Sequence, residues 1–541
     1  MAEKRIRKED WDKVEKYVAE VYDERKNSQF RKDHEQIWKE VDRQVEMKPL
    51  RRLQANGKPA PKSWHNAIEL GELAKASEII TSDVMRIMLP SDRVFFQPHV
   101  EVDWPLDQKT GRPVTDDDSQ KVQDGLLRNL MVQQHKDFGL KARVRLSVKE
   151  ALHHGSFVVE VRWEDQLMVR EGSQLRRISA PVWQPYSMWN AYPDPSPSVI
   201  GTNLFYSGTM LLVEFIPYSK WKTIVTGEGW ISSRVEQVEK RREGNGKDVE
   251  IVTLKGDVCI QRSSGDVYLP NSEVKTVNGK LVYYRPAELD YANVIYAGYE
   301  RQDVRDPYYT SPIIKLSPMS KAMTISMNKF LDWSALQVEP PIEYDSNDPD
   351  YAMNDGPEIS PGAKTGTRSM GGGFKALDIG DGKPLLTGVQ FMLQEHKEGL
   401  GVSSIRAGTS SADRQTATES TLQSQGAEVR TMEFVSQLEP LGLLPFLYMQ
   451  HELNRRKMGE YTFYNDEMHT PDFIRAHKKD IQSNVHFEVV GSKGQLGEEM
   501  RAKKQAGAVG FASQNPLFAP LLNAPEILMD LFRDAGKKNP E

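Results

Sequence analysis

Cysteine is almost absent from this chain of 541 residues. Its single cysteine, Cys259, excludes an intramolecular disulfide and any metal site built from a cysteine cluster, and it fits a reducing cytoplasm. Long apolar runs are missing as well. No stretch approaches the roughly 18 residues of a membrane-spanning helix, and the N-terminus shows no signal-peptide core. We therefore expect no membrane partner.

The motifs of common enzyme classes are also missing. The chain has no G-x-x-x-x-G-K-[ST] phosphate loop, no G-x-G-x-x-G, no G-x-S-x-G and no H-E-x-x-H. The glycine-rich segment 491–497 contains a lysine but lacks the residue order of a phosphate loop. His153 and His154 are adjacent at the end of an expected helix, where neighbouring side chains point in different directions, so they are not expected to share a metal ion.

Acidic residues offer two weaker candidates for metal chemistry. The run Asp116–Asp118 would attract a divalent cation, but an exposed aspartate run fits the start of a helix better. Glu339 and Glu343 flank a double proline, and carboxylate pairs of this kind arise by chance among 77 acidic residues. We therefore predict no catalytic residue, no metal site and no cofactor.

The charge balance limits the partners of the chain. Charged residues make up 27% of the sequence, yet the net charge is only -6, so the chain as a whole is not a general nucleic-acid binder. The mean hydropathy of -0.59 is low for a compact monomer of this length and indicates much exposed surface. An elongated subunit, or one that lies in an assembly, fits this composition. The length allows several domains or one multi-lobed subunit.

The first 300 residues are predicted to be helical at first and mainly β afterwards. Residues 1–52 are predicted to form two amphipathic helices, interpreted as charged and solvated. Further helices are expected at 64–89, with the apolar face Leu73, Ala76, Ile80, Val84 and Ile87, and at 116–155, with a strand at 94–102 between them. Strands should then predominate, including 157–163 and the hairpin 274–284 with its Asn278-Gly279 turn, apart from a helix at 217–243.

The next part of the sequence alternates long helices with an irregular module. Residues 312–335 are predicted to form a helix with Ser317-Pro318 as its N-cap and first turn. Its apolar stripe is interpreted as a packing seam and consists of Leu316, Met319, Met323, Met327 and Phe330. Residues 337–387 are rich in Pro, Gly, Asp and Ser and hold strand candidates near 341–344 and 374–379. A helix at 388–405 follows, so the module would sit at the tip of an antiparallel helical pair.

A small polar loop separates this helix from the longest helical stretch. The loop spans 407–419, and Arg406 and Arg414 are placed to touch phosphate from it. The helical stretch 416–457 is interrupted by Pro440, Gly442 and Pro445, which predicts a kink or a break. A strand at 485–490 and helices at 496–510 and 524–535 complete the expected elements.

Four landmarks follow one another along residues 64–457. They are the helix 66–90 ending at Leu89-Pro90, the turn Tyr192-Pro193-Asp194-Pro195, the run Tyr308-Tyr309-Thr310-Ser311-Pro312 followed by a helix and Pro340-Pro341-Ile342, and Asp413-Arg414-Gln415-Thr416-Ala417-Thr418-Glu419 leading into Leu438-Glu439-Pro440-Leu441. In this order they resemble the portal protein, or head-to-tail connector, of tailed bacteriophages of the short-tailed, podovirus type. The last run is similar to that family's E-R-x-T-A-x-E signature, with Asp413 in place of the usual glutamate. The glycine that the family has near position 309 is absent.

The resemblance implies an α+β, mainly helical fold with the wing, stem, clip and crown regions of phage portals, assembled into a ring of usually twelve subunits. On this analogy the chain divides into an N-terminal charged helical segment 1–63, wing 64–311, first stem helix 312–336, clip 337–387, second stem helix 388–405, tunnel loop 406–416, long kinked wing helix and wing 417–480, and crown region 481–541.

The same resemblance implies a non-enzymatic function in the virion. The ring would sit at one capsid vertex, the head–tail junction, after assembly in the host bacterial cytoplasm. It would conduct double-stranded DNA without sequence preference during packaging and ejection. Its partners would be the terminase, the major capsid or scaffold protein and the tail adaptor proteins. The implied candidates for DNA contact are Arg406, Gly408 and Arg414, and those for partner docking at the clip are Tyr351, Arg368 and Phe374.

Two alternatives stay open. The chain would also fit another structural protein of a phage tail or baseplate that shares the helix–insert–helix layout. From a different class, it would fit a metal-dependent DNA-processing enzyme that uses Asp116–Asp118 or the pair Glu339 and Glu343. Ring size and a lumen as wide as DNA separate the first alternative from a portal. DNA cleavage that depends on those carboxylates would identify the second.

Overall fold

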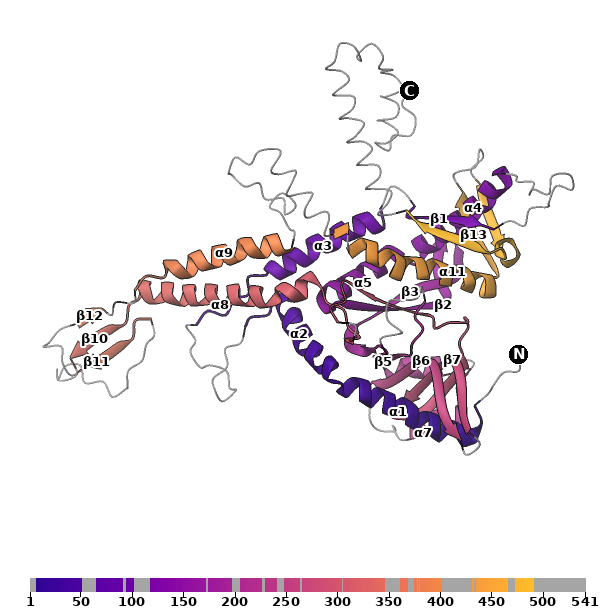
Figure 1. Cartoon of the computed structure of the whole chain (residues 1–541), viewed down its shortest axis with the longest axis horizontal. Helices are drawn as coiled ribbons and strands as arrows, with labels where there is room; N and C mark the ends of the chain where they lie inside the picture. The colour runs from indigo at the N-terminus through magenta and orange to yellow at the C-terminus, as the bar shows by residue number, and fades with distance from the viewer. Residues whose placement is uncertain are drawn as a thin grey trace, which may run out of the picture.

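The computed structural model describes residues 6–50, 65–90, 94–101, 117–171, 174–196, 205–225, 229–240, 248–262, 265–303, 305–345, 361–367, 374–376, 378, 380–400, 431–432, 434–465 and 472–490. They form a body of helices and β-sheets from which a long pair of helices projects (Figure 1). Helices and strands are both abundant, in agreement with the α+β class that the sequence predicts. No helix in the described ranges is long and apolar enough to cross a membrane.

Two antiparallel sheets form much of the body. One has the strand order β3-β2-β9 and the other has the order β4-β5-β6-β7-β8. Their strands are β2 (Ser156–Glu171), β3 (Gln174–Tyr186), β4 (Ala191–Tyr192), β5 (Met210–Ile216), β6 (Val249–Arg262), β7 (Gly265–Val277), β8 (Lys280–Pro286) and β9 (Val294–Gly298). A short 3-10 turn, η2 (Met188–Asn190), connects β3 to β4. The β-rich region predicted between 156 and about 300 is therefore confirmed.

Glycine and asparagine set two local features of the five-stranded sheet. The predicted hairpin is formed by β7 and β8, and Asn278 and Gly279 between them have φ angles of 50° and 73°, as a type I′ turn requires. The helix expected at 217–243 is instead two short helices, α6 (Tyr218–Ile224) and α7 (Ser232–Lys240). Gly229 between them has a φ of 90°, which a continuous right-handed helix cannot contain.

A buried ion pair links the two sheets. The Lys255 ammonium of β6 lies 2.6 Å from the Glu160 carboxylate of β2, and it also reaches Asn293 Oδ1 at 3.1 Å. Burial favours the neutral carboxyl, but the attraction of Lys255 outweighs it and lowers the pKa of Glu160. Removing one partner would leave an uncompensated buried charge, so this pair holds the relative position of the sheets.

The N-terminal segment forms the two predicted helices, α1 (Trp11–Asn27) and α2 (Gln29–Val45), after a 3-10 turn, η1 (Lys8–Asp10). The interpretation of these helices as solvated is wrong. Val14 and Val18 of α1 are buried in a cluster with the five-stranded sheet, and Trp38 of α2 is fully buried in the main core. Arg31 is also fully buried, although a sequence rich in charge suggests the opposite.

Three helices follow the N-terminal pair: α3 (Glu72–Met88), α4 (Asp117–Asp137) and α5 (Leu140–His154). α5 packs on β2 and β3 of the three-stranded sheet, whereas α4 packs on β1 and β13 and α3 packs on α5 and α8. The five apolar residues predicted on one face of α3 are all buried. The single helix expected at 116–155 is divided, because Gly139 adopts a φ of 62° between α4 and α5. Gly155 ends α5 with a φ of 79°, and a Cβ there would overlap the backbone carbonyl of Tyr309. The predicted cap at Gly155 is confirmed.

The C-terminal part of the described chain returns to the body. The predicted interruption of the long helix is a π-helical turn, η4 (Glu439–Leu443), which contains Pro440 and leads into α11 (Leu444–Lys457). The hairpin β13 (Glu460–Asn465) and β14 (Asp472–His477), followed by η5 (Lys478–Ile481), was not predicted. The predicted strands β1 (Phe96–Val100) and β15 (Val485–Val489) pair with each other in antiparallel orientation, which joins chain segments nearly 400 residues apart.

Candidate functional site: the helical stalk and its junction with the body

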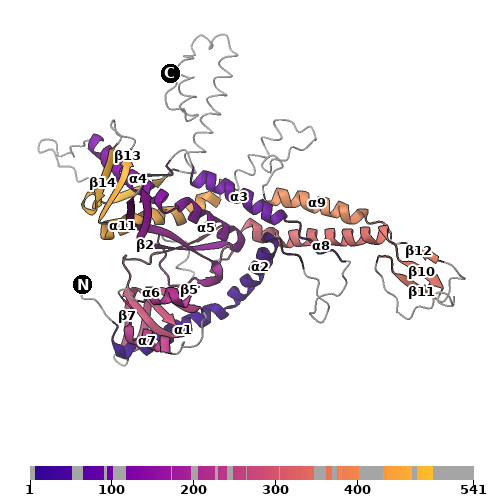
Figure 2. The same cartoon turned by 180° about the vertical axis from the view of Figure 1, so that it is seen from behind.

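The projecting helices, here called the stalk, are α8 (Pro312–Val338) and α9 (Lys383–Leu400). They run antiparallel and side by side away from the body, as Figure 2 shows from the back. The helix predicted at 312–335 is confirmed, and the helix predicted at 388–405 begins five residues earlier, at Lys383. Residues 401–405 lie outside the described part of the chain.

A small sheet lies at the outer end of the stalk. Its central strand, β10 (Ile342–Asp345), pairs in parallel with β11 (Lys364–Thr367) and in antiparallel with β12 (Phe374–Ala376). The two strand candidates near 341–344 and 374–379 are thus confirmed. The third strand escaped prediction because Lys-Thr-Gly-Thr is short, polar and interrupted by glycine.

Ser311 starts α8. Its hydroxyl oxygen accepts a hydrogen bond from the Ile314 amide at 3.1 Å, and the hydroxyl donates to the carbonyl of Leu152 at the end of α5. The predicted cap at Ser317-Pro318 is therefore wrong, since both residues lie inside the helix. The Ser-Pro pair at 311–312 carries the same capping signal six residues earlier. The helix begins at Pro312, so Ser311 is the residue that caps its first amides.

Three polar side chains of α8 hold an extended segment of the N-terminal region against the stalk. Thr324, Asn328 and Asp332 are four residues apart, so they lie along one face of the helix. Asn328 bonds both the amide and the carbonyl of Ile68, at 3.0 and 2.9 Å. Asp332 accepts from the amide of Asn66 at 2.7 Å, and Thr324 donates to Glu69 at 2.9 Å. The segment 65–69 is thereby fixed along the middle of α8.

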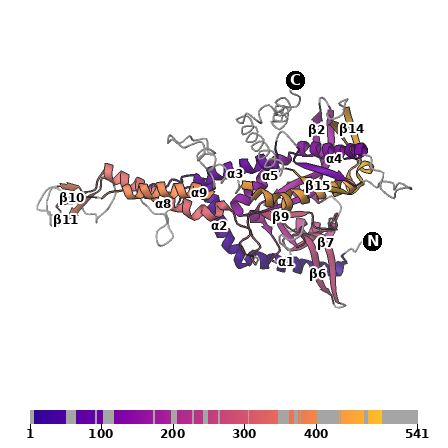
Figure 3. The same cartoon turned by 45° about the horizontal axis from the view of Figure 1, so that its top comes forward.

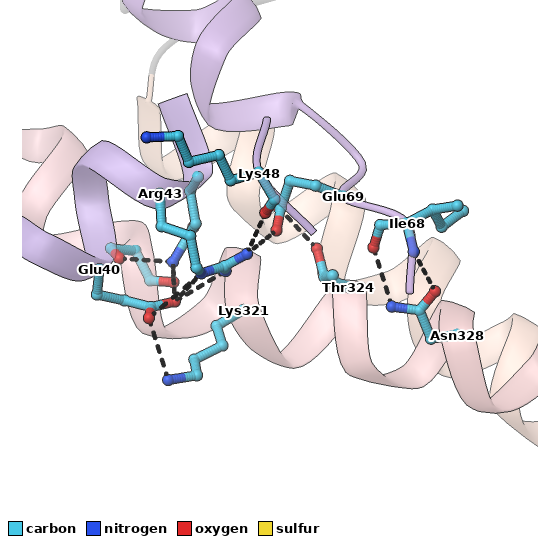
Figure 4. Close-up of polar contacts among 10 residues, drawn as sticks. Glu40, Arg43, Lys48, Ile68, Glu69, Lys321, Thr324 and Asn328 are labelled. Carbon is cyan, nitrogen blue, oxygen red and sulfur yellow. Dashed lines mark hydrogen bonds and ion pairs between the residues drawn. The ribbon is translucent and has the colours of Figure 1, made fainter. Parts of the chain in front are cut away.

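Arg43 connects this segment to α2. Its guanidinium donates to Glu69 at 2.7 Å and to Glu40 at 2.9 Å, and Lys321 of α8 lies 3.3 Å from the Glu40 carboxylate (Figure 4). Burial opposes ionisation of Glu40, but the hydrogen bonds from Arg43 and Gln44 outweigh it and lower the pKa of that carboxyl. The network therefore joins α2, the 65–69 segment and α8 through charged groups.

Glycines allow α8 and α9 to approach each other closely. A Cβ at Gly382 would overlap the ring of Trp333, and a Cβ at Gly399 would lie 3.1 Å from Leu316. These contacts lie at opposite ends of α9. Of the predicted apolar stripe on α8, Met323 is buried, while Leu316, Met319, Met327 and Phe330 are partly exposed. The seam between the helices thus covers only part of their apolar surface.

A buried arginine brings two of the sequence landmarks together. Arg31 donates to the carbonyls of Met188, Trp189 and Ala191 at 2.9, 2.8 and 3.0 Å, directly before the turn at 192–195. The same guanidinium lies 5.8 Å from the ring centroid of Tyr308, which precedes α8. Sequence reasoning missed this role, because nothing in a charged helix marks which of its arginines faces inward.

Nearby, Arg25 secures the turn itself. Its guanidinium donates to the carbonyls of Tyr192 and Thr209 at 3.0 and 2.8 Å and lies 3.3 Å from the Asp194 carboxylate. Asp194 in turn accepts from the amide of Thr209 at 3.2 Å. The turn at 192–195 is therefore held by a side chain from α1.

The two adjacent histidines at the end of α5 have separate partners. His154 lies between Asp42 and Glu150, with nitrogen–oxygen distances of 3.0 and 2.6 Å, whereas His153 contacts the hydroxyl of Ser77 at 2.7 Å. They do not converge on a common point. In the described part of the chain, no three His, Cys, Asp or Glu side chains are grouped in a way that could hold a metal ion.

Most of the predicted site residues lie outside the described residues: Arg406, Gly408, Arg414, Tyr351 and Arg368. Phe374 is described through its backbone and stands opposite Tyr344 in the sheet at the end of the stalk. Asp117 begins α4, Glu339 follows the end of α8, and Glu343 lies in β10. The acidic residues considered for metal chemistry thus belong to separate elements.

No protein-family model matches the chain, and a search of curated proteins finds no match to it.

Proposed function

We propose that this protein is the subunit of a phage portal, a non-enzymatic ring at one vertex of the virion capsid. In this role it would conduct double-stranded DNA during packaging and ejection. It would dock the terminase first and tail adaptor proteins afterwards. The proposal begins from the four ordered sequence landmarks, of which the E-R-x-T-A-x-E-like run at 413–419 is the most specific.

The observation that carries the proposal is the stalk. An insertion between two antiparallel helices forms a small sheet far from the body, and the chain returns along α9 toward the body (Figure 1). This layout parallels the stem and clip that the resemblance implies, with α8 and α9 as stem helices and β10, β11 and β12 in the clip. Such an arrangement presents a docking surface at the outer end of the subunit.

Incomplete burial of apolar side chains supports self-association. Phe391 of α9 is 64% exposed, and Val338 at the end of α8 is 78% exposed. Phe30 and Ile37 of α2 are also exposed. These exposed apolar side chains are available for contact with another protein surface. In a ring, two different faces of each subunit meet, so one copy would cover the residues that its neighbour leaves open.

Electron microscopy of the purified full-length protein tests the proposal. We expect rings, usually of twelve subunits, with a central channel wide enough for duplex DNA and with α8 and α9 of neighbouring subunits in contact. A stable monomer, or an assembly without such a channel, would refute it. A closed assembly with a lumen too narrow for DNA would instead favour another structural protein of the tail or baseplate.

A further inference from the structure

The two stalk helices are held in different ways. Polar side chains hold α8 at its base, through Ser311 and through Gln44–Ser317 at 2.9 Å, and farther out through the ladder to segment 65–69. α9 is tied at its outer end, where Trp333 and Gln337 both donate to the carbonyl of Gly380 at 3.2 Å. These hydrogen bonds hold the outer end of α9 and do not reach its base end.

His396 occupies the base end of α9. Its side chain is 1% exposed, and its Nε2 has no hydrogen-bond partner within the described residues. It lies seven residues from Val389, which in turn lies seven residues from Gly382, so these three buried positions share the face toward α8. Because the Nε2 atom makes no hydrogen bond to the part of the chain that the structure describes, packing of the neutral ring, rather than a polar contact of this nitrogen, seats this end of α9.

The surroundings of His396 oppose a positive charge. The base end of α9 lies beside the first turn of α3, as the tilted view in Figure 3 also shows. Burial lowers the pKa of His396 below its usual value, and Glu72 of α3 counteracts this shift only in part. Glu72 is itself bonded to Lys75 at 2.8 Å. On α8, Lys315 and Lys321 are engaged with Glu300 and Glu40.

We propose that α9 is the movable helix of the stalk and that His396 is its latch. The neutral imidazole seats the base end of α9 against α8 and α3. The protonated imidazolium moves out of this seat toward water and Glu72, while α8 stays fixed by its polar ladder. A base with a lowered folded pKa favours the seated state above its unfolded value of about 6.5 and loses that preference as the pH falls below it. The inference does not depend on the proposed function.

Hydrogen–deuterium exchange of the full-length protein tests the latch. We expect the opening of residues 390–400, corrected for intrinsic exchange, to increase roughly tenfold between about pH 7.5 and about pH 5, because the open state binds the proton. The amides of α8 should change little. His396→Phe keeps a ring of similar size without a titratable group and should abolish the increase. His477→Phe, at an exposed position on β14, serves as the matched control and should leave it intact.

A second variant provides a test if His396→Phe fails to fold. Glu72→Gln removes the carboxylate that favours the imidazolium, so the transition of α9 should shift to lower pH. Exchange of α9 that is independent of pH in the wild type would overturn the inference. So would an increase that survives His396→Phe, an unshifted transition in Glu72→Gln, or an opening of α8 in parallel with α9.

Discussion

At the scale of single residues, surroundings rather than identity decide the charge of buried groups. His153 and His154 are neighbours in the sequence, yet burial lowers the pKa of His153 to about 4. Burial acts in the same direction on His154, but the Asp42 and Glu150 carboxylates outweigh it and raise its pKa to about 9. One histidine is therefore neutral and the other is charged at neutral pH, within the same turn of α5.

The charge of His154 predicts a loss of stability in mild alkali. Its folded pKa lies above the unfolded value, so its contribution is complete below pH of about 6.5 and is lost as the pH rises through about 9. The decrease in the free energy of unfolding should reach about 3 kcal/mol. Urea denaturation across this range measures it. His154→Gln should flatten the decrease, whereas the exposed His477→Gln should not; equal slopes in both variants would contradict the assignment.

At the scale of elements, short polar contacts decide where the stalk leaves the body. Apolar packing alone would allow α8 to rotate or slide, because such contacts have no preferred direction. The hydrogen bonds that Thr324, Asn328 and Asp332 make with segment 65–69, as donors or acceptors, define both the rotation and the register of α8. Arg43 of α2 donates hydrogen bonds to Glu69 of this segment and to Glu40 of its own helix. The orientation of the stalk is therefore coupled to the N-terminal helices.

Asn328→Ala tests the ladder. It leaves the amide and the carbonyl of Ile68 without their side-chain partner, which should lower the free energy of unfolding by about 2 kcal/mol. Faster hydrogen exchange at Ile68, measured by NMR or mass spectrometry, should accompany the loss. Lys329→Ala changes the adjacent exposed position and should have little effect. If both variants leave the exchange of Ile68 unchanged, the segment is held by other forces.

At the scale of the whole molecule, the core of the body and the small sheet at the end of the stalk lie far apart. The body buries its core between sheets and helices, whereas the stalk carries its small sheet away from that core. Changes in the small sheet at the end of the stalk can therefore be made without disturbing the core of the body. This separation suits a subunit whose central contacts and outer docking surface have different partners.

The proposed channel gives a test at this scale. Deleting 407–413, or the substitution Arg414→Glu, should leave ring formation intact while reducing DNA packaging or retention severalfold, because a carboxylate repels the phosphates that an arginine attracts. Electron microscopy checks the rings, and nuclease-protected DNA in assembled particles measures packaging. Rings that fail to form would show that this loop is structural, and normal packaging would remove it from the DNA path.

Local patterns predicted most elements of this fold. The apolar face of α3, the Asn278-Gly279 hairpin, the helices on either side of the insertion and the break at Pro440 all follow from residues close in sequence. The errors arose where two local signals competed, as with Ser311-Pro312 and Ser317-Pro318. They also arose where a charged side chain was expected to be exposed but is buried, as with Arg31.

The sequence by itself therefore determined the order of helices and strands, the insertion between two helices and the resemblance on which the proposed function rests. Only the tertiary structure decided that β1 pairs with β15, that Arg31 is a buried connector and Arg43 a partly buried one, and that His396 of α9 is buried with its Nε2 unpaired among the described residues. The physical reason is the separation along the chain of the groups that interact. Helices and turns depend on neighbours within a few residues, whereas burial, pairing and pKa depend on groups brought together from hundreds of residues apart.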